Sequence, residues 1–485
     1  MSKFARALAA FGAGSVVGTL TQVVKGKVGA VALGVEGVGV FTQLTNAWSL
    51  LYTVSGLGYY NGIVRQMSRS NVGADDIELN RHLVTALVFL TSFSVLMTSA
   101  AGLLSSHLSQ LLFNDGGARA SLVAMALCSV PVAIATQTYA GLASAKQLVK
   151  QIVTVQVVSD LASLALFVVL VQYSGLSGAV LSFGLSNLLK LVVQIWFVSK
   201  KVTIAPVRLW YTHFRLASIR ENFAFGMSGL LLVTLSLLST IAVSRWIVLE
   251  LGVYSSGLYA VAWRVSSLYF GVLYASASGY YFPLLAAKTS SEQITALINE
   301  ACSAYMYALA PIAICLIVGA QELLVALFSA EFAAAAALLI LFVCGDIFRV
   351  SAETIGLSLL AQERVRAYSV TYVLWLLVFL GAGWMCVSRF GLVGLGYAYV
   401  GSHCLNFLVV LATVNRMLSV GLSTPTLRAI SVSVFLSLAS ALVSSHSEVA
   451  VRYLFGAVAL MCWFSVAWLD PTFQNLVRRV AGRSK

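Results

Sequence analysis

The sequence is poor in charged residues. Only 10% of its 485 residues are Asp, Glu, Lys or Arg, whereas soluble domains carry about 25%. Hydrophobic residues make up 60% of the chain, and its mean hydropathy is +0.92. The scarcity of charge excludes a soluble globular protein and predicts an all-α polytopic membrane protein.

Acidic residues are scarcer than basic ones. The chain has 17 Asp and Glu residues against 30 Lys and Arg residues, which gives a net charge of +13. This excess does not indicate a nucleic-acid partner, because most of the basic residues lie between apolar stretches, where charges that determine membrane topology belong.

Motifs of soluble enzymes and metal sites are absent from the sequence. None of the seven cysteines forms a CxxC pair, so we interpret them as free thiols that pack among apolar residues. The five histidines form no HExxH motif, and there is no P-loop. A membrane-bound glycosyltransferase or polymerase would need a large outside loop or an acidic metal-binding motif, and neither is visible. We therefore expect no enzyme activity, catalytic residue, cofactor or metal.

Long apolar segments fill the chain instead. About twenty apolar residues span a bilayer, and by this rule the sequence predicts about fourteen transmembrane helices. The first apolar run follows Lys3 and Arg6 as in a signal peptide, but it is too long and contains lysines, so we expect an uncleaved helix. The predicted segments are 8–33, 38–62, 82–105, 119–144, 149–173, 176–199, 221–248, 255–283, 299–319, 333–360, 367–388, 391–414, 427–445 and 451–469.

The basic residues predict the orientation of these segments. An even number of segments places both termini on one side of the membrane. The loops on that side contain most of the basic residues, whereas the opposite loops contain only Arg119, Arg389 and Arg452. By the positive-inside rule, both termini are expected to be cytoplasmic.

Two sets of residues recur along the chain and predict an internal repeat. The stretch Gly175-Leu-Ser-Gly178 resembles Gly391-Leu-Val-Gly394, and residues 145–150 resemble residues 361–366 at the same offset. Near the start of each half, Lys27 and residues 33–35 match Arg245 and residues 251–253 at nearly that offset. We therefore expect Lys27 and Arg245 at similar depth on equivalent helices.

The repeat predicts the domain organisation. Six helices per half is an even number, so the halves are parallel repeats about an axis along the membrane normal. The expected parts are a six-helix lobe at 1–199, a cytoplasmic linker at 200–220, a six-helix lobe at 221–415, and two additional helices with a basic cytoplasmic tail at 416–485.

Lysines embedded in the first segment are candidate functional residues, because a charge inside a membrane is expensive. Lys25 shares a helical face with Gly18, Gln22 and Gly29, and such a face suits either a cavity or a close helix contact. Lys27 lies on a more apolar face, where it either binds substrate or reaches the outer head groups.

Two arginines are further candidates for substrate binding. Arg65 closes the second segment at the cytoplasmic edge, where it either fixes topology or contacts a ligand. Arg264 lies deep in the eighth segment on a stripe of small residues, so we expect it to face a cavity. The stripe consists of Gly257, Ala260, Ser267 and Gly271.

Three charged residues in the tenth segment form an acid–base–acid series. Asp346, Arg349 and Glu353 are three and four residues apart, which places them on one helical face. They either neutralise one another or act in coupling or gating as a proton or cation relay, because an embedded acid can exchange protons.

Asp160 and Lys190 lie in the antiparallel fifth and sixth segments, at similar distances from the cytoplasmic side. An unpaired charge at that depth costs several kcal/mol, and a hydrogen-bonded pair offsets much of that cost. We therefore predict that the two residues form a structural ion pair.

Short motifs in these segments resemble the polysaccharide exporters of the multidrug/oligosaccharidyl-lipid/polysaccharide superfamily, and most closely the Wzx-type flippases of O-antigen and enterobacterial common antigen units. The motifs follow one another through the first twelve segments. They are Gly26-Lys27-x2-Ala30, Gly34-x2-Gly37-x-Gly39, Asn61-Gly62-x2-Arg65, Tyr280-x2-Pro283-x-Leu285, Gly345-Asp346-x2-Arg349 and Phe390-Gly391-x2-Gly394.

The resemblance implies two lobes around a central cavity that opens alternately to the two sides of a bacterial inner membrane. It implies a substrate, an oligosaccharide linked to undecaprenyl pyrophosphate, that moves from the cytoplasmic to the periplasmic leaflet. Expected partners are this lipid-linked glycan, membrane lipids and the glycan polymerisation machinery, with the protein as a monomer. Fourteen segments exceed the twelve common among O-antigen flippases, which leaves the glycan class open.

The alternative function is a cation or drug antiporter of the same fold. Such an antiporter would need an acid in the cavity of the first lobe, where Asp160 is the only embedded acid. A pyrophosphate instead needs cations, and the embedded Lys25, Lys27 and Arg264 would provide them through charge-assisted hydrogen bonds.

Overall fold

The computed structural model describes residues 3–72, 76–202, 214, 216–277, 281–446, 448–470 and 473–474. Within these residues the regular secondary structure is entirely helical. The chain divides into two compact units, Met1–Gly257 and Leu258–Lys485. Each unit is described separately below.

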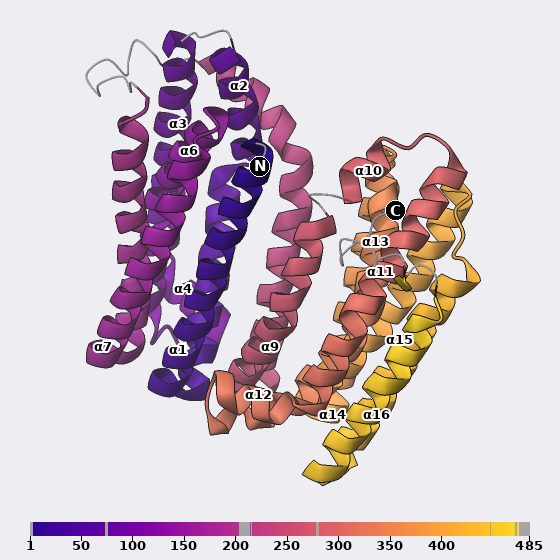
Figure 1. Cartoon of the computed structure of the whole chain (residues 1–485). Helices are drawn as coiled ribbons and strands as arrows, with labels where there is room; N and C mark the ends of the chain where they lie inside the picture. Colours follow the sequence, from indigo (N-terminus) through magenta and orange to yellow (C-terminus); the bar gives the residue numbers. More distant parts are fainter. Residues whose placement is uncertain are drawn as a thin grey trace. The chain divides into compact units, whose positions relative to one another are not determined.

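Helices α1 to α7 and the first part of α9 belong to the first unit (Figure 1). Their bounds are α1 Lys3–Gly56, α2 Tyr59–Val72, α3 Asp76–Leu103, α4 Ser105–Phe113, α5 Ala120–Leu127, α6 Val130–Ala145, α7 Val149–Ser199 and α9 Leu216–Ser276. The second unit contains the rest of α9, α10 Phe282–Ala286, α11 Ser291–Val318, α12 Ala320–Leu327, the short 3-10 helix Ala330–Ala335, α13 Ala336–Ala361, α14 Val365–Leu418, α15 Thr424–His446 and α16 Val449–Trp468.

The predicted number of membrane-spanning segments is confirmed. Ten helical stretches of the described chain are long and apolar enough to cross a membrane. Four of them contain a glycine with non-helical backbone angles that divides the stretch in two. Each part keeps about twenty residues, which is enough to span a bilayer. The described chain therefore has fourteen segments of spanning length.

The four dividing glycines lie in or directly next to the gaps between predicted segments. Gly34 and Gly252 have φ angles of 66° and 83°, and Gly175 and Gly391 have φ angles of 52° and 60°. Positive φ is accessible to glycine without steric cost, whereas a Cβ atom disfavours it. The members of each pair occupy matching positions of the predicted repeat. The turns of the two halves therefore reverse the chain through a glycine with positive φ at the same position.

A second glycine in two of these turns packs directly against backbone. A Cβ atom on Gly178 would lie 1.8 Å from the carbonyl oxygen of Leu170, and one on Gly394 would lie 2.1 Å from that of Cys386. The two glycines match each other in the repeat, and the two carbonyl groups match at the same offset. The two turns are thus closed by the same contact, which requires glycine in both.

Gly39 and Gly257 contact each other reciprocally within the first unit. A Cβ atom on Gly257 would lie 2.0 Å from the carbonyl oxygen of Val35, and one on Gly39 would lie 2.9 Å from that of Val253. Gly39 matches Gly257 at the offset that relates Lys27 to Arg245, and Val35 matches Val253 in the same way. The contact therefore joins equivalent positions of the two repeats, and its close approach depends on the absence of side chains.

Several predicted boundaries differ from the observed ones. The fourth segment is two helices, α5 and α6, because the chain breaks at Cys128 and Ser129 before Pro131, whose missing N–H favours a helix start. The ninth segment begins earlier, at Ser291, where Ser290 caps the helix by accepting a hydrogen bond from the Gln293 N–H.

Some predicted features lie outside the described residues. These include most of the linker at 200–220, Tyr280 of the eighth segment and the basic tail from residue 475 onward. The predicted lobe boundary, which lies within that linker, stays a prediction.

Packing within each unit positions the embedded polar residues. In the first unit α1 packs along α7, and α6 contacts α2, α3 and α7. In the second unit α13 is the central helix, because it packs against α11, α14 and α15 (Figure 1). Buried apolar side chains of α11, α13, α14 and α15 form a core around it. Polar groups of α13 are therefore enclosed by apolar neighbours.

We expect Gly257→Ala to destabilise the protein by about 1–3 kcal/mol, because the added methyl group overpacks the contact with the Val35 carbonyl. Thermal unfolding of the purified protein in detergent measures the effect. The matched control is Gly271→Ala in the same helix α9, where an added Cβ would meet no atom within 4 Å. Equal melting temperatures for the two variants would contradict the close contact.

Candidate functional site

Asp346 is the centre of a buried polar cluster in the second unit. Its side chain on α13 is completely inaccessible to solvent. The Ser266 hydroxyl donates a hydrogen bond to its carboxylate at 2.6 Å, and the Tyr399 hydroxyl donates another at 2.7 Å. A third hydrogen bond comes from the Tyr269 hydroxyl. Donors from α9 and α14 thus hold the carboxylate, which stabilises its ionised form in an apolar surrounding.

Arg349 neutralises this carboxylate. Its Nη1 lies 3.6 Å from the Asp346 Oδ1 and donates a hydrogen bond of 3.2 Å to the Tyr399 hydroxyl. The guanidinium carbon lies 3.5 Å from the ring centroid of Phe270, so the positive charge also rests on an aromatic face. The arginine is therefore held by one acid and two aromatic residues.

Of the three charged residues that the sequence places on one face of the tenth segment, two form a recorded ion pair. Asp346 and Arg349 pair as the three-residue spacing predicts. The hydroxyl partners Ser266, Tyr269 and Tyr399 were missed, because side chains of other helices give no periodic signal along α13. The one available signal was the spacing of Ser266 and Tyr269, which places two hydroxyl groups on one face of an apolar helix.

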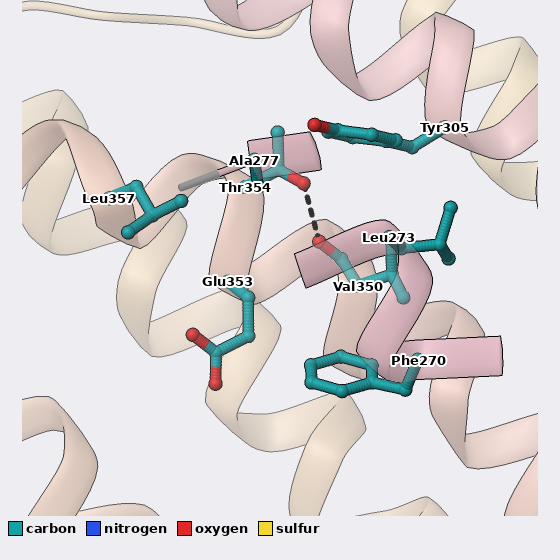
Figure 2. A pocket seen from close by; sticks show the side chains of 8 residues that line it. All are labelled: Phe270, Leu273, Ala277, Tyr305, Val350, Glu353, Thr354 and Leu357. Carbon is teal, nitrogen blue, oxygen red and sulfur yellow. Dashed lines mark hydrogen bonds between the residues drawn. The ribbon is translucent and has the colours of Figure 1, made fainter. Parts of the chain in front are cut away.

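Glu353 lies one helical turn beyond Arg349, in a different environment (Figure 2). It lines a cavity of about 20 Å³ together with apolar and aromatic side chains that include Phe270, Leu273 and Tyr305. Among the described residues, its one recorded hydrogen bond comes from the Tyr368 hydroxyl at 3.5 Å, the long limit for such a bond. Its carboxylate attracts Arg349, but the recorded ion pair of that arginine is with Asp346.

A second polar cluster joins α1 and α7 in the first unit. The Lys25 ammonium group donates a hydrogen bond of 2.5 Å to the Ser163 hydroxyl, which in turn donates one of 2.7 Å to the Ser186 hydroxyl. Asp160, one turn before Ser163, is attracted by Lys190 and by Lys25. The cluster therefore places one acid near two lysines, which leaves one positive charge in excess when all three are ionised.

The face of α1 that carries Lys25 makes a close helix contact. A Cβ atom on Gly18 would lie 3.0 Å from the Asp160 Oδ2, and one on Gly29 would lie 3.3 Å from the Phe167 ring. Of the two interpretations that the sequence left open for this face, the contact with α7 is the one that these distances favour. Lys25 thus points toward a protein neighbour.

The other predicted substrate-binding residues lie on different elements. Lys27 on α1 is half-buried, and Arg65 on α2 is exposed beyond a turn at Leu57 and Gly58, both of which have positive φ. Arg264 on α9 is half-buried and belongs to the second unit. Lys27 and Arg65 belong to the first unit and Arg264 to the second, and the role of these residues in one binding site stays a prediction.

The second unit also contains a larger cavity of about 820 Å³. Its lining is mainly apolar and comes from α11 to α16, with the buried Arg452 at one edge. The guanidinium group of Arg452 pairs with Glu322 of α12, so it adds no net positive charge. This cavity therefore suits hydrocarbon better than a pyrophosphate.

Metal ligation has no candidate in the described part of the chain, where no group of three or more His, Cys, Asp or Glu side chains is close enough to hold an ion. The chemistry available to the two clusters is thus hydrogen bonding, charge pairing and proton exchange.

Tyr399→Phe should lower stability by about 1.5–3 kcal/mol, because it removes a buried hydrogen bond to an ionised carboxylate. Thermal unfolding in detergent tests this. Tyr397→Phe is the matched control, since Tyr397 lies in the same helix and is 51% exposed. The cluster would lose its proposed structural role if both variants unfolded at the wild-type temperature.

The predicted pair of Asp160 and Lys190 can be tested by a double substitution. Among the ion pairs recorded for the described residues, none of 4.0 Å or less joins these two groups, so the direct pair stays a prediction. We expect Asp160→Asn and Lys190→Met each to lower the yield of folded protein and the double variant to recover part of it. Lys25→Met combined with Asp160→Asn is the parallel test. Losses that simply add in both combinations would exclude coupling to either lysine.

Comparisons with known proteins identify the family. Residues 11–289 match the family model described as polysaccharide biosynthesis protein, which is more than half of the chain. The chain is 23% identical to the lipid III flippase of Escherichia coli strain K12 over 415 residues, which cover 83% of this chain and 94% of that protein. The lipid III flippase of Shigella flexneri matches equally well.

Solved structures of other proteins share the fold of this chain. A lipid II flippase, MurJ, in an inward closed conformation aligns with a TM-score of 0.70 at 13% identity and covers 97% of this chain and 99% of its own. An inward-facing multidrug resistance transporter of the MATE family aligns with a TM-score of 0.69 at 13% identity, covering 83% and 94%. The predicted fold is thereby confirmed, and by its family match the chain belongs to the polysaccharide biosynthesis protein family.

Proposed function

We propose that this protein is a flippase that moves an oligosaccharide linked to undecaprenyl pyrophosphate from the cytoplasmic to the periplasmic leaflet of a bacterial inner membrane. The observation that carries the proposal is the similarity to lipid III flippases, which extends over 83% of the chain. The all-helical fold with fourteen segments of spanning length agrees with it. Transport proceeds by alternating access, and the protein has no catalytic step.

The pyrophosphate group is the part of the substrate for which contacts with the protein matter most during passage through the membrane. Two phosphates cannot leave the head-group region without cations to replace their water. Lys27 and Arg264 are embedded, half-buried and positively charged, and both lie inside the family match. We assign them to a basic cavity that holds the pyrophosphate, with Arg65 as a first contact at the cytoplasmic edge.

We assign a structural role to two other embedded cations, and their recorded contacts support this assignment. Arg349 is paired with Asp346, and Lys25 is held by Ser163 next to Asp160. A cation already neutralised by a protein acid gains little from a phosphate, because binding would first have to break the existing pair. Lys25 shares Asp160 with Lys190, and its hydrogen bond to Ser163 supports its assignment in this proposal as a positioning residue between α1 and α7.

A cation or drug antiporter is the alternative on the same fold. Its cation would need an available carboxylate in the first lobe, and Asp160 is attracted by two lysines instead. This arrangement favours the flippase. The cytoplasmic position of both termini, the monomeric state and contact with the glycan polymerisation machinery belong to the same proposal.

Transport in proteoliposomes tests the function. The purified protein should move a polyprenyl-pyrophosphate-linked oligosaccharide between leaflets, measured by the access of an added glycosidase or lectin to the outer leaflet. An organic cation is the comparison substrate. Movement of the cation without movement of the glycolipid would establish the antiporter and overturn the flippase.

Arg264→Ala should abolish glycolipid transport while the folded yield stays close to that of wild type. Arg264→Lys should restore only part of the rate, because lysine lacks the planar guanidinium group that binds phosphate through two hydrogen bonds. The matched control is Arg389→Ala, which removes one positive charge from an exposed position. Normal transport by Arg264→Ala would exclude this arginine from the substrate pathway.

A further inference from the structure

Glu353 differs from Asp346 in what surrounds its carboxylate. Asp346 receives three hydroxyl hydrogen bonds and the charge of Arg349, whereas the one recorded hydrogen bond of Glu353 in the described chain is the long contact with Tyr368. Both acids are on α13, two turns apart. The hydrogen bonds and the arginine therefore support an ionised carboxylate more strongly at Asp346 than at Glu353.

Charge balance in the cluster depends on the proton of Glu353. Asp346 and Arg349 neutralise each other, so an ionised Glu353 leaves one net negative charge within apolar helices. A protonated Glu353 leaves the cluster neutral. Because a net charge is costly at this depth, adding or removing that proton changes the energy of the whole cluster.

The cavity beside Glu353 supplies a place for water. Figure 2 shows the Glu353 side chain among the lining residues Phe270, Leu273 and Leu357. The cavity volume of about 20 Å³ exceeds the roughly 10–15 Å³ that one water molecule needs. The Glu353 carboxylate is the one charged group among the residues that line this mainly apolar cavity.

Within the described part of the chain, few other titratable groups are recorded near this carboxylate. Arg349 is the one cation among those recorded around it, and phenol groups stay neutral near physiological pH. The neighbouring groups are Arg349, Asp346, Tyr368 of α14, Tyr305 of α11, and Tyr269 and Tyr281, with His403 of α14 close to Arg349.

We propose that Glu353 is the site that binds and releases a proton during the transport cycle, with Asp346 as the permanent anion that holds Arg349. A hydronium ion delivers the proton: one of its O–H bonds breaks and leaves water, and an O–H bond forms on the Glu353 carboxylate, which becomes a neutral carboxylic acid. Release of the proton to water restores the second negative charge, so Asp346 and Glu353 then compete for Arg349. This competition can shift α13 against α9 and α14, because Asp346 and Arg349 are bonded to both.

Infrared difference spectroscopy tests proton binding without any transport assay. The purified wild-type protein at neutral pH should show the carbonyl stretch of a protonated carboxylic acid, shifted in D₂O and lost at alkaline pH. The band should be absent from Glu353→Gln and retained in Asp346→Asn. Glu36→Gln, which changes an exposed acid, is the control that should leave it unchanged. Absence of the band from wild type, or its loss only in Asp346→Asn, would overturn the proposal.

A coupling role rests on the proposed flippase function and needs a second measurement. A proton gradient should stimulate glycolipid movement by wild type, and Glu353→Gln should lose that stimulation while keeping movement down the substrate's own gradient. Glu353→Asp, which keeps an acid, should retain part of it and also guards against a packing defect of the glutamine variant.

The two failures are distinguishable. If wild type moves no glycolipid, the flippase function fails, and the infrared band still decides whether Glu353 binds a proton. If wild type moves glycolipid and Glu353→Gln responds to the gradient as wild type does, the function stands and the coupling role of Glu353 is wrong.

Discussion

A charge enclosed by membrane-spanning helices has to be matched, and this constraint accounts for the arrangement of the polar residues. Water cannot solvate such a charge, so a counter-ion, several hydrogen bonds or a bound substrate must replace it. Asp346 receives both kinds of support within the protein, from Arg349 and from three hydroxyl groups. Lys25 is matched by Ser163 and the nearby Asp160. Charges matched in this way hold helices together, and a pyrophosphate that enters the membrane would need the same support from the cations of its site.

The backbone meets the same constraint through helices and glycine turns. Every peptide group in the hydrocarbon region must find an internal partner, so a reversal between two spans keeps its non-helical backbone either very short or outside that region. Gly175 and Gly391 adopt positive φ angles. Gly178 and Gly394 have no Cβ atom, which leaves room for a carbonyl oxygen to pack closely against them. These pairs recur at a single offset, so the two halves of the repeat share the same turn structure.

Much of this fold could be predicted from the sequence, because its strongest determinants are local. Apolar length predicts the number of spans, and glycine predicts the turn at Gly34 as well as the one at Gly252. Helix ends were predicted less well where a cap decides them, as at Ser290, or a proline, as at Pro131. The pairing of Asp346 with Arg349 was accessible for the same local reason, since both lie on one face of one helix.

Contacts between helices could not be predicted in this way. Tyr399 reaches Asp346 from a different helix, and no periodicity along either helix indicates that bond. Likewise, the small-residue face around Lys25 was compatible with a cavity or with a neighbouring helix, and only the distances to α7 favour the helix. What remains predicted from the chain alone is the role of Lys27, Arg65 and Arg264.

The central claim is that embedded cations divide into those that hold helices together and those that bind a pyrophosphate. Native mass spectrometry of the purified protein with added undecaprenyl pyrophosphate tests this division most directly. Binding should be lost in Arg264→Gln and kept in Lys25→Gln, because only the first removes a charge that the substrate uses. The reverse pattern, or equal binding by both variants, would contradict the account.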